Sequence, residues 1–72
     1  MNKYETLYND IKQYAIWKLG ENHSYTVKLV KIFDTLSNDI KELLEHMTEE
    51  QLDKIFFAYA DDIDLQAKGS EN

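Results

Sequence analysis

The stretch SYTVKLVKIFDTLSNDIKELLEHM, residues 24–47, decides the fold because it can form either one long helix or two shorter ones. Its apolar residues alternate spacings of four and three, as on one face of a helix. They are Leu29, Phe33, Leu36, Ile40, Leu43 and Met47. The spacing stays in phase through TLSND, residues 35–39, where helix propensity is poor. We therefore predict one helix over residues 24–46, about 34 Å long by the rise of an α-helix. The alternative is a break at which Ser37 caps a second helix.

A further helix is predicted before this stretch. Asn2 followed by Glu5 has the capping-box pattern, which indicates a helix over residues 3–19 that stops at Gly20. Its apolar stripe would be Tyr4, Leu7, Tyr8, Ile11 and Ala15.

A second capping-box pattern, Thr48 followed by Gln51, predicts a helix over residues 49–68. Its inward stripe would be Leu52, Ile55, Phe56, Tyr59 and Ile63. The chain is therefore predicted to be a small all-α, three-helix protein with a long central helix, forming a single domain over residues 1–68. Residues 69–72 would be a flexible C-terminal tail.

The small size of the chain favours self-association. It has 72 residues and no cysteine, so its core is small and no disulfide can stabilise it. The longest apolar stripe offers a seam for a homodimer or a higher oligomer. This seam would consist of Leu29, Phe33, Leu36, Ile40 and Leu43.

The net charge of −6 comes from the second half of the chain. Residues 38–72 hold ten acids against three lysines, whereas residues 1–37 hold four acids against five lysines. An acidic surface repels phosphate backbones and attracts basic protein surfaces, so we expect no direct nucleic-acid binding. No apolar run reaches the roughly 18 residues that cross a bilayer, and the N-terminus lacks a signal-peptide core. We therefore expect a cytoplasmic protein with no membrane partner.

Phe57 is an apolar residue that the helical pattern does not place in the core. It lies about 140° around the helix from Leu52, well outside the inward stripe. It stands instead in a column of acids, which are Glu50, Asp53, Asp61 and Asp64. Three interpretations are open. Phe57 packs on Trp17, which is also off its stripe, or it forms a dimer contact, or it anchors a basic, partly apolar partner.

Lysines and aromatic residues alternate in KQYAIWK, residues 12–18. Lys12, Tyr14, Trp17 and Lys18 could hold a small anionic ligand such as a nucleotide, by ion pairing and stacking. The competing interpretation is that these aromatic side chains close the core over the loop that follows.

The sequence indicates no catalytic residue, no metal site and no cofactor. A nucleophilic enzyme needs a serine or cysteine beside a positioned histidine, and here Ser24 merely follows His23 in the chain. The acids around His46 lack the spacing of di-iron bundles, and those around Asp62 lack the spacing of calcium loops.

These observations predict a non-enzymatic, small acidic helical interaction protein that binds a larger protein with a basic or mixed basic and apolar surface. Its size and composition are similar to those of regulators and inhibitors encoded by phages and mobile elements. One alternative is a nucleic-acid mimic, in which Asp53, Asp61 and Asp64 imitate phosphates and block a nucleic-acid-binding protein. A second alternative is a small anionic-ligand sponge that uses the residues of the KQYAIWK segment.

Overall fold

The computed structural model describes residues 2–70, which fold into four helices joined by short connections. They are α1 (Lys3–Leu19), α2 (Ser24–Asp34), α3 (Asn38–Glu45) and α4 (Glu49–Ser70). The all-α prediction is confirmed for this part of the chain. The prediction of three helices with a long central helix is wrong, because residues 24–46 form two helices.

The break between α2 and α3 has a local cause. The Thr35 hydroxyl donates to the carbonyl oxygen of Lys31 over 2.8 Å, and the Thr35 N–H also turns back to that carbonyl. Two residues later, Ser37 Oγ accepts the N–H of Ile40 over 3.3 Å and caps α3. Side chains of this kind compete with the helical hydrogen bonds of the backbone. The alternative with Ser37 as a new N-cap is therefore the one that the structure adopts.

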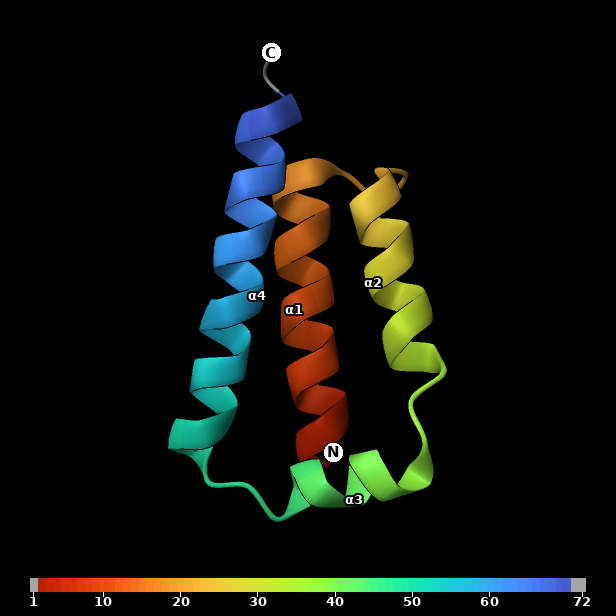
Figure 1. Cartoon of the computed structure of the whole chain (residues 1–72), viewed down its shortest axis with the longest axis vertical. Coiled ribbons are helices and arrows are strands. Elements are labelled where there is room, and N and C mark those ends of the chain that lie inside the picture. The colour runs from red at the N-terminus through yellow and green to blue at the C-terminus, as the bar shows by residue number, and fades with distance from the viewer. Residues whose placement is uncertain (1, 71–72) are drawn as a thin grey trace.

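The helix at the centre of the molecule is α1. Figure 1 shows α4 along one side of α1 and α2 along the other, while α3 crosses beneath the N-terminal end of α1. The chain runs in the same direction in α1 and α4, and in the opposite direction in α2. The molecule measures 40 × 23 × 17 Å, which is little more than one layer of helices in its thinnest direction.

The core gathers around the ring of Phe33. Its centroid lies 5.2 Å from that of Tyr8 on α1, in a stacked arrangement, and 5.6 Å from that of Tyr59 on α4. The Tyr4 hydroxyl donates to the Phe33 carbonyl oxygen. The predicted stripe of α1 is confirmed as core, with Ile11 fully buried, and Ile63 is its buried counterpart on α4.

A clasp between α3 and α1 holds the cross-helix in place. The backbone N–H groups of Lys3 and Tyr4 donate to the Glu45 carboxylate over 3.1 and 2.9 Å. In return, Lys3 Nζ donates to the Met47 carbonyl oxygen over 2.8 Å. Glu45 thus satisfies N–H groups that have no partner within α1, and its negative charge lies at the positive end of that helix.

Both predicted capping boxes mark helix starts in the structure. Asn2 Oδ1 accepts the Glu5 N–H over 2.7 Å, and Thr48 exchanges hydrogen bonds with Gln51 over 2.9 and 3.2 Å. At the other end, α4 extends through Ser70, so Gly69 and Ser70 of the predicted tail are helical. The remainder of that tail, 71–72, lies outside the described residues.

Candidate functional site

An open groove of about 800 Å³ lies between α1 and α4. Along α1 its wall includes Tyr14 and Trp17, and along α4 it includes Leu52, Phe56 and Phe57. No residue of α2 lines it. The groove therefore lies on the side of the α1–α4 pair that α2 leaves uncovered.

Four aromatic rings form a continuous row across this groove. The centroids of Trp17 and Tyr14 lie 5.7 Å apart, those of Tyr14 and Phe56 5.9 Å, and those of Phe56 and Phe57 5.6 Å. Tyr14 and Phe56 are half-buried, whereas Trp17 is 73% and Phe57 61% exposed. Phe57 is therefore not a core residue, and Trp17 is not covered by it. We call this row the aromatic row.

The groove also carries more negative than positive charge. Asp10 lines it on α1, and Glu49 and Asp53 line it on α4. Lys3 is the basic residue of the lining, and its Nζ is hydrogen-bonded to the Met47 carbonyl oxygen. The apolar row thus has acidic edges, which is the arrangement of an interface with an apolar centre and a polar rim.

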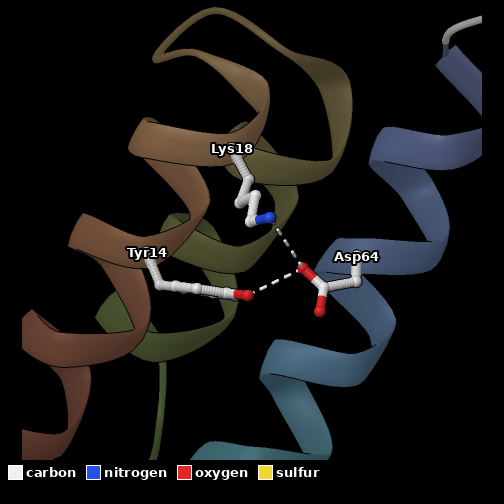
Figure 2. A network of polar contacts seen from close by, with 3 residues as sticks. All are labelled: Tyr14, Lys18 and Asp64. Atoms are coloured by element: carbon white, nitrogen blue, oxygen red, sulfur yellow. Dashed lines mark hydrogen bonds and ion pairs between the residues drawn. The ribbon is translucent and has the colours of Figure 1, made fainter.

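A polar network fixes one end of the aromatic row (Figure 2). The Tyr14 hydroxyl donates to Asp64 Oδ1 over 2.7 Å, and Lys18 Nζ lies 3.7 Å from the same oxygen. The hydrogen bond to Asp64 raises the pKa of Tyr14, and desolvation and the charge of Asp61 raise it further. Lys18 Nζ also lies 4.8 Å from the Trp17 ring centroid, within cation–π range. These contacts tie α1 to α4 next to the exposed tryptophan.

The predicted acidic column of α4 is distributed over several environments. Glu50, Asp53, Asp61 and Asp64 are all exposed. Asp53 lines the groove, Asp64 belongs to the Tyr14 network, and Glu50 lies outside the lining. The row proposed for nucleic-acid mimicry therefore includes one carboxylate, that of Asp64, which already has a hydroxyl and an ammonium partner.

The predicted ligand residues do not converge on one place. Tyr14, Trp17 and Lys18 lie together, but Lys12 Nζ lies 5.8 Å from the ring centroid of Tyr8. Lys12 lines a separate hollow of about 310 Å³, which it shares with Thr26. The four residues therefore do not form a single anion-binding site.

The predicted oligomer seam is not one surface either. Leu29 and Phe33 are buried in the core at 4% and 3% exposure, and Leu36 is half-buried. Ile40 and Leu43 lie on α3 and are 43% and 63% exposed. The break at Ser37 separates the two halves, so the seam residues of α2 are covered by the chain itself.

Sequence reasoning noted that Trp17 and Phe57 both lie off their stripes, but it could not place them in one groove. Among residues 2–70 no cluster of histidine and acidic side chains is suited to hold a metal ion, and no helix there has the length and apolarity to cross a membrane. Comparison with protein-family models, with curated proteins and with solved structures gave no significant match.

Proposed function

We propose that this chain is a non-enzymatic interaction protein that binds a larger protein through the groove between α1 and α4. The observation that carries the proposal is the exposure of Trp17 and Phe57, at 73% and 61%, in the same groove. Solvent-exposed aromatic clusters with polar edges are typical of binding surfaces.

The energetics of the aromatic row support such a use. Burying one large apolar side chain contributes about 1.5–3 kcal/mol, and tryptophan and other aromatic anchors often dominate protein interfaces. Tyr14 contacts the Trp17 ring and Phe56 contacts the Phe57 ring, so the two exposed rings are already partly ordered and binding would immobilise few additional side chains. The acidic edges would favour a partner with basic residues around an apolar centre.

Site-specific crosslinking tests this proposal. A photo-crosslinking amino acid is placed at position 17 or 57, and as controls at positions 27 and 65. Val27 and Leu65 are also exposed, at 53% and 65%, but neither lines the groove. In cells that encode the chain, positions 17 and 57 should capture the same protein, and the control positions should not. An excess of the chain without the photo-crosslinking amino acid should reduce this capture, and its Phe57→Ala variant should reduce it much less.

Equal capture at positions 57 and 65, or competition that is unchanged by Phe57→Ala, would contradict the proposal. The salt dependence of binding to the captured partner also distinguishes this proposal from nucleic-acid mimicry. Binding through carboxylates that imitate phosphates weakens steeply with added salt, whereas binding through an aromatic anchor depends on salt only moderately. A role as a regulator or inhibitor follows if the captured protein loses activity when it binds this chain through the groove.

Self-association is a separate proposal, and it would use a smaller surface than the seam predicted from the sequence. Leu29 and Phe33 are buried in the chain itself, so pairing of two copies would use Ile40 and Leu43 on α3. Sedimentation of the wild-type chain beside Leu43→Asp tests this. A mass above that of the monomer that falls in the variant would support pairing through α3, and a monomer at every concentration would contradict it.

A further inference from the structure

We infer that the partner enters the groove as an amphipathic helix with basic residues along both edges, and that it packs against α1 and α4 on the side away from α2. This inference rests on the proposed function and names the chemistry of the partner.

The first step is the packing of α1 and α4. Two packed helices have a valley on each side of their contact. Phe33 of α2 fills one valley, where it meets Tyr8 of α1 and Tyr59 of α4. The opposite valley is the groove, with Trp17 and Phe57 exposed in it. A further helix in that valley would pack against α1 and α4 and bury the two exposed rings.

The second step is the shape of the groove. On α1 its wall runs from Lys3 to Trp17 along one face of the helix, about 21 Å by helical rise. Both walls are helices, which satisfy their own backbone hydrogen bonds and offer no open edge to an extended peptide. Strand addition needs an open sheet edge, whereas an amphipathic helix binds by placing its apolar face in a hydrophobic groove. The groove therefore suits a helix of about 14 residues or more.

The third step is charge. Glu49 and Asp53 lie one helical turn apart on the α4 edge, and Asp10 lies on the α1 edge. Lys3 is the basic residue of the lining and its Nζ is bonded to the Met47 carbonyl oxygen, while Lys18, next to Trp17, has its Nζ 3.7 Å from Asp64. A helix with lysine or arginine on both flanks would complement these edges. A second copy of the chain would bring the same acidic edges and a net charge of −6, so like charges would oppose its entry.

Three synthetic peptides of about 18 residues test the inference. The first carries leucines on one helical face and lysines on both flanks. The second has glutamates in place of the lysines. The third has the composition of the first in an order that distributes the leucines around the helix. Trp17 is the only tryptophan in the chain and lies in the groove, so its fluorescence reports binding.

The first peptide should bind at least about tenfold more tightly than either of the others, and it should gain helix on binding, as measured by circular dichroism. Phe57→Ala should weaken its binding by about 30-fold. Leu65→Ala, at an exposed position outside the groove, should leave it unchanged. Because the first and third peptides have equal charge, their difference isolates the apolar face from simple ionic attraction.

Equal binding of the first and third peptides, or no binding of the first, would overturn the inference. A Trp17 signal that depends on protein concentration without peptide, and that Phe57→Ala abolishes, would place a second copy in the groove and would also overturn it. The two proposals fail separately. If positions 17 and 57 capture a protein and the first peptide, added before crosslinking, does not reduce this capture, the helical partner alone is contradicted. Absence of any groove-dependent capture contradicts the proposed function itself.

Discussion

The rings of Phe56 and Phe57 meet edge to face, with 5.6 Å between their centroids and 72° between their planes. The two neighbours nevertheless have different surroundings. Phe56 is half-buried and packs against the core, and its ring also contacts Tyr14 across the groove. Phe57 is 61% exposed. One ring therefore belongs to the packing between α1 and α4, and the other rests on it and faces solvent.

This difference leads us to expect that truncating Phe56 costs more stability than truncating Phe57. Phe56→Ala should lower the free energy of unfolding by about 2–4 kcal/mol, somewhat less than for a fully buried ring. Phe57→Ala should lower it by less than about 1.5 kcal/mol. Urea unfolding measures both, with Leu65→Ala as the control for an exposed apolar position. A Phe57→Ala variant as unstable as Phe56→Ala would show that the ring contributes to the core.

The clasp between α3 and α1 should be important for stability. Glu45→Ala removes the acceptor of the Lys3 and Tyr4 N–H groups, and we expect a loss of about 1–2 kcal/mol. Glu42→Ala is the matched control, because Glu42 is an exposed glutamate on the same helix, and it should change stability by less than about 0.5 kcal/mol. Equal losses in the two variants, measured by thermal unfolding, would contradict the clasp.

The sequence predicted those features that depend on neighbouring residues. The capping boxes at Asn2 and Thr48 and the apolar stripe of α1 are set by spacings of three and four residues, and the structure confirms them. The spacing of apolar residues gave a wrong prediction at Ser37. The helical spacing continues from Leu36 to Ile40, but the helix itself ends before Ser37 and a new one begins after it. What decides there is the competition between a serine cap and one more helical turn, together with the attachment of Glu45 to α1.

The groove could not be predicted, because it depends on which helices pack side by side. The sequence placed Trp17 and Phe57 off their stripes, and each could then have been covered by the other. In the structure, α1 and α4 run in the same direction with α2 on one side only, so both rings lie in the uncovered valley. α3 crosses beneath α1 and separates the end of α2 from the start of α4, and the prediction of one long helix over residues 24–46 did not contain this cross-helix.

The cap at Ser37 can be tested with two substitutions at the same position. Ser37→Ala removes the acceptor of the Ile40 N–H and should lower the free energy of unfolding by about 0.5–2 kcal/mol. Ser37→Gly should lower the free energy of unfolding by only a few tenths of a kcal/mol, because glycine is itself tolerated at an N-cap. Ser24→Ala is the control, since His23 and not Ser24 caps α2. If alanine and glycine are equally well tolerated at position 37, the serine does not act as a cap.

The stability of the fold should fall in alkaline solution, in part because of Tyr8. Burial raises the pKa of Tyr8 from 10.0 to about 12, helped by its hydrogen bond to Asp34 and by the negative charge of that carboxylate. The folded state therefore holds the phenolic proton more tightly than the unfolded chain does. The contribution of the protonated Tyr8 hydroxyl to the free energy of unfolding is fully present below pH 10 and is lost as the pH rises from 10 to about 12.

Tyr8→Phe isolates this contribution. At neutral pH the variant should be less stable than the wild type by about 0.5–1.5 kcal/mol, because it lacks the hydrogen bond to Asp34. Between pH 10 and about 12 the difference should shrink and then reverse, since phenylalanine has no proton to lose. Tyr4, Tyr14 and Tyr25 also have raised pKa values, so the variant should retain part of the alkaline loss. Urea unfolding across this range measures the difference, and a constant offset between the two chains would show that the proton on Tyr8 is not coupled to folding.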